Sequence, residues 1–183
     1  EVPRVQPTAA LRIGCFGALR PLKNTLEQAF GAIIFANRRR QNLEFVINSN
    51  RVEQHAEPVL KNLRGLFNDH PHHKLVELPW MDHRAFLGQI STMDLGLQVS
   101  FSESFNIVAA DFAASGIPIV VSDEIFWMPD RFKALTTDAR DIADRLHAVS
   151  RMPDFINKCQ MRWALRKYNV DSEFQWLNFI KRR

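Results

Sequence analysis

The sequence predicts an α/β domain in which a doubly wound parallel sheet carries helices on both faces. Short apolar runs alternate along the chain with segments whose apolar residues recur at helical spacing. The apolar runs are nearly continuous, which is typical of parallel strands that are buried on both faces. The chain has 183 residues, the length of one domain. We therefore expect a linker or lead-in over residues 1–10 and a single Rossmann-like domain over residues 11–183.

The elements follow in order. Five strands are expected at 11–16, 43–48, 74–78, 95–99 and 117–122, with a short sixth at 133–135. Helices are expected at 25–38, 57–67, 82–92 and 105–115, and amphipathic helices over 139–149 and most of 153–183. Asn24 and Glu27 have the spacing of a capping box, and Asp82 is a candidate helix cap. Gly116 supplies a left-handed helix end, after which Pro118 prevents the helix from resuming.

Composition narrows the class of protein only a little. The net charge of +4 comes largely from residues 38–40 and 181–183, and it suits a diphosphate, a nucleic acid or an anionic membrane surface equally. No run of apolar residues is long enough for a membrane span or resembles a signal peptide. Cys15 lies in a predicted buried strand, which favours a reduced protein. We expect a cytoplasmic location and no nucleic-acid partner, and we leave peripheral membrane contact through the basic ends open.

The loop and helix after the fourth predicted strand carry the clearest functional pattern. Glu103 lies in the loop, and Asp111 follows about two helical turns later, so the two carboxylates can face one ligand from roughly ten ångströms apart. Between them, the free N–H groups of residues 105–107 would open the helix and attract a phosphate. Carboxylates that accept hydrogen bonds from sugar hydroxyls, beside amides that hold a diphosphate, indicate a nucleotide-sugar site.

Here the sequence resembles the retaining glycosyltransferases of the GT-B fold, in the large family that carries an E-x7-E motif. Residues 99–122 match its pattern of a strand, S-x-x-E-x-F/G-x5-E, a helix of small residues and G-x-P-V-V, with Asp111 at the second Glu. Residues 13–24 are similar to the family's glycine-bearing first loop with its Lys. The resemblance covers about residues 11–180. It implies one half of a GT-B fold, the donor-binding domain of a hexosyltransferase-type enzyme.

The resemblance also implies roles for the matching positions. Glu103 would hold hydroxyls of the transferred sugar, and Lys23 would bind the diphosphate; these two are the expected catalytic residues. Asp111 would bind the ribose hydroxyls, and Trp80 and Met81 would lie along the nucleobase. The other expected donor-binding residues lie in the first loop and at the start of the helix after Glu103: Gly17, Arg20, Ser104, Phe105, Asn106 and Ile107.

No cofactor or metal is expected beyond the nucleoside-diphosphate sugar itself. A Lys or Arg can stabilise the departing nucleoside diphosphate, and no D-x-D pair stands on a suitable loop. We interpret His70, His72 and His73 as a solvated turn, because no carboxylate or Cys framework accompanies them. His83 and His147 have no interpretable constellation.

Two departures from the family pattern keep alternatives open. Ala18 stands where the family often has an Arg, and Arg20 is a candidate substitute. Asp111 is one methylene shorter than Glu. The chain could therefore be a non-catalytic GT-B-like interaction module, or a nucleotide-sugar epimerase, which needs no second substrate. Our main expectation remains a sugar transferase with retention, whose unknown acceptor is held by a missing N-terminal domain and which is poorly active alone.

The closing helical segment is rich in large apolar side chains, among them Trp163, Tyr168, Phe174 and Trp176. We interpret most of these as core packing. The alternative is that the segment crosses to the missing partner domain. The chain begins with Glu1 rather than Met, which fits a piece cut from a longer product.

Overall fold

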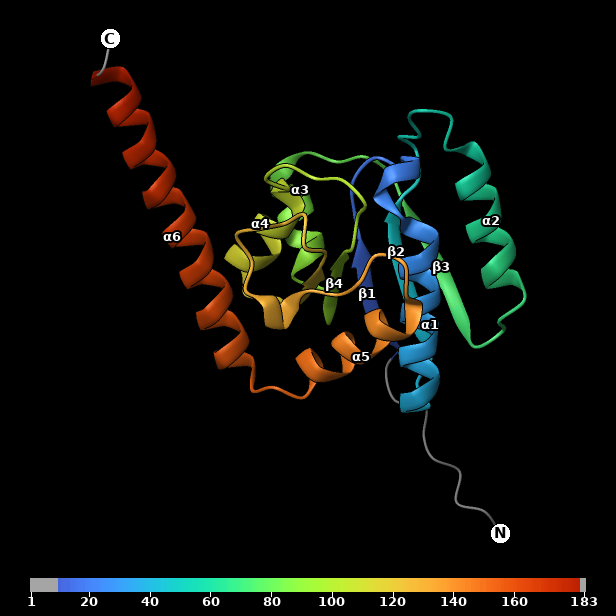
Figure 1. Cartoon of the computed structure of the whole chain (residues 1–183). Coiled ribbons are helices and arrows are strands. Elements are labelled where there is room, and N and C mark those ends of the chain that lie inside the picture. The colour runs from blue at the N-terminus through green and yellow to red at the C-terminus, as the bar shows by residue number, and fades with distance from the viewer. Residues whose placement is uncertain (1–9, 182–183) are drawn as a thin grey trace.

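A computed structural model describes residues 10–181, so most of the expected lead-in at residues 1–10 lies outside the described residues, as do Arg182 and Arg183. A parallel five-stranded sheet with the order β3-β2-β1-β4-β5 forms the centre of the domain (Figure 1). Its strands are β1 (Leu11–Cys15), β2 (Leu43–Asn48), β3 (His73–Leu78), β4 (Leu95–Gln98) and β5 (Ile119–Val121). The order reverses between β1 and β4, which is the topological switch point of a doubly wound sheet.

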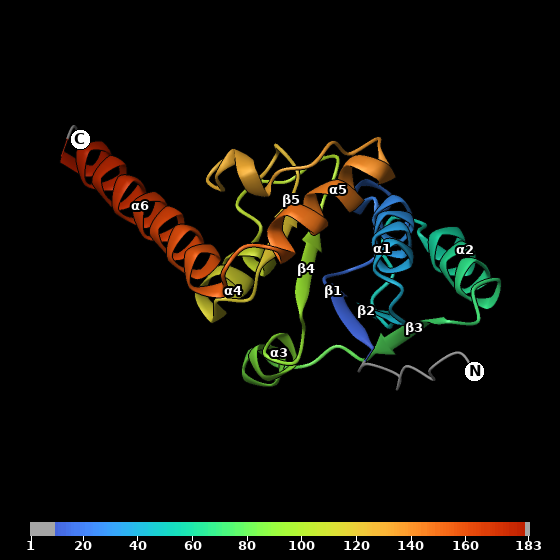
Figure 2. The same ribbon diagram turned by 90° about the horizontal axis from the view of Figure 1, so that it is seen from below.

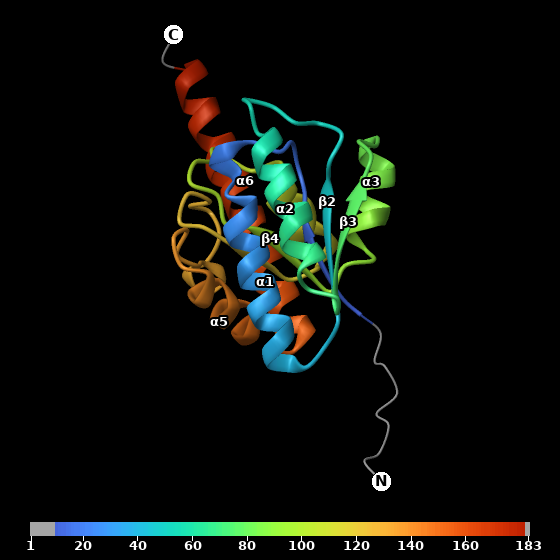
Figure 3. The same cartoon turned by 90° about the vertical axis from the view of Figure 1, so that its right-hand side faces the viewer.

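Helices cover both faces of this sheet. They are α1 (Thr25–Arg39), α2 (Glu57–Asn68), α3 (His83–Ile90), α4 (Ile107–Ser115), α5 (Ala139–Ser150) and α6 (Asp154–Lys181), with short 3₁₀ helices η1 (Pro21–Lys23) and η2 (Asp130–Phe132). Figures 2 and 3 show α1, α2 and α5 on one face and α3 on the other, where α4 contacts both α3 and α6. The predicted fold class is thereby confirmed.

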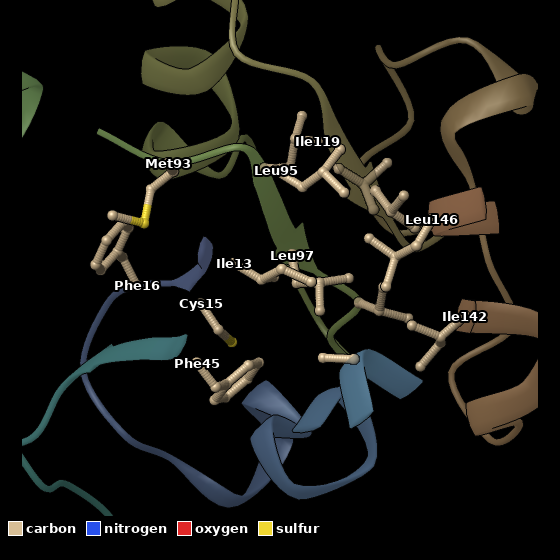
Figure 4. Packing of buried hydrophobic residues seen from close by; sticks show 14 of the residues in the cluster. Ile13, Cys15, Phe16, Phe45, Met93, Leu95, Leu97, Ile119, Ile142 and Leu146 are labelled. Atoms are coloured by element: carbon tan, nitrogen blue, oxygen red, sulfur yellow. The ribbon is translucent and has the colours of Figure 1, made fainter. Parts of the chain in front are cut away.

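The core explains why the apolar runs became parallel strands. Ile13, Phe45 and Leu97 are fully buried between the helical layers, and Ile142 and Leu146 of α5 pack toward them (Figure 4). Each such side chain stabilises the fold by roughly 1.5–3 kcal/mol through burial. Since side chains on both faces of β1, β2 and β4 are buried, alternation of polar and apolar residues is absent from these strands.

One glycine of β4 sets the distance between the sheet and α4. A Cβ at Gly96 would come within 2.7 Å of the Phe112 ring and 2.9 Å of Ile119. Phe112 therefore packs directly against the strand backbone, and its side chain is fully buried. This contact brings α4 close to the sheet.

The predicted helix ends are confirmed at two places and wrong at a third. Asp82 caps α3 by accepting a hydrogen bond from the amide of Ala85 at 2.9 Å, and Gly116 ends α4 with a φ of 78°. The predicted capping box of Asn24 and Glu27 is wrong, because both side chains have long-range partners. The Asn24 amide donates to two carbonyls outside its own helix, and the Glu27 carboxylate accepts from the amide of Ala139.

Three further predictions need correction. His73, expected in a solvated turn, is instead the buried first residue of β3, and its Nε2 lies 3.0 Å from Oδ1 of Asn37. The sixth strand at 133–135 is absent, since only a single bridge joins Lys133 to Val121. The helix predicted to begin at Phe105 begins at Ile107, with Asn106 as its N-cap. In place of a sixth strand, the segment after β5 contains η2 and leads into α5.

The closing segment is one 28-residue helix, α6, that runs past the sheet and away from the body of the domain (Figure 1). Only Asn157, Met161 and Ala164 are buried in it. Its large apolar side chains are mostly exposed, namely Phe155, Trp163, Val170, Phe174, Trp176, Leu177, Phe179 and Ile180. Core packing was therefore the wrong interpretation for most of them. Within residues 10–181, no helix combines the length and apolar character needed to cross a membrane.

Candidate functional site

The loop that follows β1 is held by side-chain amides from neighbouring strands. The buried Gln98, the last residue of β4, donates through Nε2 to the carbonyl of Phe16 at 2.8 Å. Asn48, the last residue of β2, accepts from the amide of Gly17 at 3.2 Å and donates to the carbonyl of Pro79. Gly17 has a φ of 115°, a conformation that favours glycine. The loop therefore has a defined position at the carboxyl edge of the sheet.

Two further amides fix the end of this loop, where Lys23 lies. Gln28 donates to the carbonyl of Lys23 at 2.7 Å and accepts from the amide of Val99 at 2.8 Å. Asn24, in a left-handed conformation, donates to the carbonyl of Val99 at 3.1 Å. Both backbone polar groups of Val99 thus hold the residues that surround Lys23.

As a result, the Lys23 ammonium lies against Oε1 of Glu103. The two side chains are 22% and 9% exposed, so the pair is mostly shielded from solvent. A carboxylate as buried as that of Glu103 needs a cation or hydrogen-bond donors beside it, and Lys23 supplies them. The expected catalytic residues are therefore in contact.

The start of α4 offers unpaired backbone donors. Asn106 adopts a left-handed conformation with a φ of 58°, and its Oδ1 accepts from the amide of Ala109 at 2.8 Å. Its Nδ2 donates to Oε1 of Gln98 at 2.9 Å, which extends the buried amide network to this helix. Within residues 10–181, the amides of Ile107 and Val108 have no partner. Among the described residues, the amides of Phe105 and Asn106 have no partner either, so Val108 adds one donor at the positive end of the helix dipole to the predicted 105–107 set.

A pocket of about 420 Å³ opens beside this helix start. Five expected donor-binding residues line it: Gly17, Trp80, Met81, Ile107 and Asp111. Phe86 and Val108 add to its mainly apolar wall, while the polar side chains of Asn48, Asp82 and His83 stand at the same pocket. An apolar slot with a few polar groups is the usual form of a small-molecule site.

Asp111 has an unexpected partner in this pocket. Its Oδ1 lies 3.0 Å from Nε2 of His83, the first residue of α3. The Asp111 side chain is 14% exposed and that of His83 is 66% exposed. The contact joins α3 to α4 across the pocket wall.

Arg20 and Trp80 contact residues of the segment that follows β2. The Arg20 guanidinium pairs with Glu53 at 2.6 Å, and Arg51 pairs with the same carboxylate at 2.6 Å. Hydrogen bonds from Arg51 and Arg20 hold the pKa of Glu53 below its usual value. Arg51 also lies 4.7 Å from the centre of the Trp80 ring, a cation–π contact. The amide of Trp80 donates to Asn50 at 2.7 Å.

The structure therefore divides the predicted residues into two groups. Glu103 lies in the loop before α4 and Asp111 lies in α4, but only Asp111 lines the pocket, whereas Glu103 pairs with Lys23. Four other predicted residues do not line the pocket, namely Arg20, Ser104, Phe105 and Asn106. Phe105 is occupied by packing, since its ring stacks on Tyr168 and its carbonyl accepts from Trp127 Nε1 at 2.7 Å.

Some residues of the site were not found from the sequence. His83 carried a weak signal, because it follows a predicted cap at the carboxyl edge of a strand. The amides of Gln28, Asn48 and Gln98 carried none, since their partners are 5 to 82 residues away. Among the described residues, no group of three or more His, Cys, Asp or Glu side chains is arranged to hold a metal ion.

Known structures share this fold. No protein-family model and no curated protein sequence matches the chain. The structure is similar to a trehalose-6-phosphate synthase, OtsA, with a TM-score of 0.75 and 15% identity over 95% of this chain and 44% of that chain. It is also similar to a UDP-forming α,α-trehalose-phosphate synthase from Burkholderia xenovorans in complex with glucose-6-phosphate, with a TM-score of 0.74, 16% identity and coverage of 94% and 44%.

A third similar structure is trehalose-6-phosphate from E. coli bound with UDP-2-fluoro glucose, with a TM-score of 0.65, 15% identity and coverage of 88% and 44%. At such identities the likeness concerns the fold. The chain is a Rossmann-like α/β domain that corresponds to one half of a GT-B fold. It spans less than half the length of each of these three chains.

Proposed function

We propose that this chain is the donor-binding half of a retaining GT-B glycosyltransferase of the E-x7-E type. It binds a nucleoside-diphosphate sugar, and the sugar is transferred to an acceptor that another domain holds. The observation that carries the proposal is the shared position of two features at the start of α4. Glu103, which pairs with Lys23, lies in the loop that leads into α4, and Ile107, Val108 and Asp111 of that helix line the pocket.

The proposed donor lies with its nucleobase in the pocket and its sugar toward Glu103. The apolar slot beside Trp80 and Met81 accommodates a nucleobase, and Asp111 accepts from ribose hydroxyls. The diphosphate then meets the amides of Ile107 and Val108 together with the ammonium of Lys23. The sugar extends toward Glu103, whose carboxylate accepts hydrogen bonds from its hydroxyls.

In the transfer step, the bond between the anomeric carbon and the diphosphate oxygen breaks, and a bond from the acceptor hydroxyl oxygen forms. The proton of the acceptor hydroxyl passes to solvent, and negative charge gathers on the departing nucleoside diphosphate. Lys23 and the amides of α4 stabilise that charge, which lowers the barrier because they are already in place. These residues do this without a metal ion. Retention of the anomeric configuration belongs to the same proposal.

The structural neighbours support the proposed chemistry at a general level. Two of them are described as trehalose-phosphate synthases, one of which is UDP-forming, and a third is bound with UDP-2-fluoro glucose. A nucleotide sugar as donor is consistent with these descriptions.

A second domain is part of the proposal. The exposed apolar side chains of α6, including Trp163, Phe174 and Trp176, offer a surface that such an acceptor-binding domain would cover. Exposed clusters of this kind commonly mark protein interfaces. The isolated chain is then expected to bind donor but to transfer sugar slowly.

Thermal unfolding with UDP-, GDP- and ADP-glucose tests the proposal. A ligand at about 100 times its Kd stabilises a protein by roughly 2.7 kcal/mol, so at least one of the three should raise the midpoint by several degrees. Lys23→Ala should abolish that rise, whereas the exposed Lys61→Ala should retain it. A folded chain that responds to none of the three would contradict the proposal.

Assays on a longer parent protein separate the alternatives raised by Ala18 and Asp111. Replacement of Lys23 and Glu103 should abolish sugar transfer there. Unchanged transfer would favour a non-catalytic interaction module. A changed donor sugar without any acceptor would favour an epimerase.

A further inference from the structure

His83 is the one ionisable side chain in the pocket to which neither the sequence nor the similarity to other proteins gives a role. It stands at the first position of α3, where Asp82 caps the helix through the amide of Ala85. The cap fixes the direction of the first turn of α3. α3 and α4 are in contact, so the imidazole faces the carboxylate of Asp111 across the pocket wall.

The contact leaves two acceptor atoms for a ligand. Nε2 of His83 lies 3.0 Å from Oδ1 of Asp111, and with the proton on Nε2 the imidazole is the donor. Nδ1 is then an acceptor. Among residues 10–181, neither Nδ1 of His83 nor Oδ2 of Asp111 has a partner, and both residues line the pocket. The pair therefore presents two acceptors that belong to different helices.

A vicinal diol is the complementary ligand group, because it carries two O–H donors on adjacent carbons. Asp111 is one methylene shorter than a glutamate, so its carboxylate reaches less far into the pocket from α4. The imidazole, which is held by that carboxylate, extends the acceptor surface from the opposite helix. The remaining wall near Trp80, Met81 and Phe86 is apolar and offers a flat ring a place to pack.

We propose that His83 and Asp111 together recognise the two adjacent ribose hydroxyls of the donor nucleotide, and that His83 makes the pocket select ribonucleotides over deoxyribonucleotides. This inference rests on the proposed nucleotide-sugar function. His83 is a specificity-determining residue that touches the nucleoside and takes no part in bond making at the sugar. A site built to pair with a hydroxyl rejects an analogue that lacks it, since a polar group that the bound ligand covers is then left unpaired.

The test compares the affinities of UDP, 2′-deoxy-UDP and 3′-deoxy-UDP by calorimetry, with the GDP and ADP series in parallel. The wild-type chain should bind the ribonucleotide roughly tenfold more tightly than at least one deoxy analogue. His83→Phe keeps a ring but has neither donor nor acceptor, and should reduce that ratio to about twofold or less. His83→Gln carries both a donor and an acceptor and should restore part of it. His147→Phe, on α5 at the other face of the sheet, is the matched control and should change nothing.

The outcomes distinguish this inference from the function on which it rests. If the wild-type chain binds ribo- and deoxyribonucleotides equally, the inference is overturned and the proposed function stands. If His83→Phe weakens all three ligands by the same factor, His83 has only a structural role and the inference is again overturned. If a folded chain binds no nucleoside diphosphate of the three series, both fail together.

Discussion

Lys23 pairs with Glu103 although 80 residues separate them along the chain. Lys23 ends the 3₁₀ helix η1 after β1, and Glu103 lies in the loop after β4, so the pair joins the two strands at the switch point of the sheet. In open α/β sheets, ligands bind outside the carboxyl ends of strands at such a point. The pair thus lies at the edge of the sheet where proteins of this fold commonly bind their ligands.

The two members of the pair should affect donor binding differently. We expect Lys23→Ala to weaken UDP and UDP-glucose alike, by about tenfold or more, because a charge-assisted contact to the diphosphate is lost. Glu103→Gln should leave UDP affinity within about twofold and remove the additional affinity that the sugar gives UDP-glucose. Competition titrations with both ligands measure this. Equal losses in the two variants would contradict the assigned roles. If a GDP- or ADP-sugar is the donor, the same comparison applies to it.

The buried side-chain amide of Gln98 should contribute to the stability of the domain, because it pairs with two other polar groups. Gln98→Leu leaves the backbone carbonyl of Phe16 and the side-chain Nδ2 of Asn106 without their partner. Each buried polar group left unsatisfied costs about 1–3 kcal/mol, so the free energy of unfolding should fall by roughly 2–4 kcal/mol. Urea unfolding measures the change. The exposed Gln175→Leu is the control, and a loss below about 0.5 kcal/mol in Gln98→Leu would rule out the proposed network.

Cys15 gives the domain a pH dependence of stability. Burial raises the pKa of its thiol from 9.0 to about 12. The thiol of the unfolded state loses its proton first, so this stability is present below pH 9 and declines as the pH rises toward 12. Between pH 8 and 10 the free energy of unfolding should fall by about 1.4 kcal/mol through this thiol. Urea unfolding at both pH values should show a fall that is larger in the wild type than in Cys15→Ala by about that amount; an equal fall in the two proteins would contradict the prediction.

The exposed aromatic residues of α6 should be neutral in the chain itself. The Trp163 and Trp176 side chains are 64% and 65% exposed, so Trp163→Ser and Trp176→Ser should change the free energy of unfolding by about 0.5 kcal/mol or less. In a longer parent that contains an acceptor-binding domain, the same changes should lower transfer activity or separate the domains. Thermal unfolding of the chain and activity of the parent together check this. A large loss of stability in the isolated chain would mean that these residues pack within the domain.

The strands and most helices were predictable because their signals are local. Apolar runs placed β2 at its observed bounds, and the helix that ends at Gly116 was placed correctly at its end. Its beginning was set two residues too early, because the left-handed turn at Asn106 depends on a partner in β4. Asn24 failed as a cap for the same reason, since its amide satisfies carbonyls that are distant in sequence.

The candidate site was predictable in part. The spacing of Glu103 and Asp111 correctly placed both residues around the start of α4. Sequence spacing could not show that Lys23 reaches Glu103 or that His83 reaches Asp111, because these contacts depend on how separate loops and helices meet. The surface of α6 was misjudged because an aromatic-rich helix has the same composition whether it is buried in its own domain or covered by another.

The most direct measurement is a calorimetric titration of the folded chain with UDP, GDP and ADP, repeated with Lys23→Ala and Asp111→Ala. The account predicts saturable one-to-one binding of at least one nucleotide. It also predicts that each substitution weakens this binding by about tenfold, since one removes a contact to the diphosphate and the other a contact to the ribose. Binding that both variants retain in full would show that the ligand lies elsewhere. The absence of binding for all three nucleotides would contradict a nucleotide-sugar site in this domain.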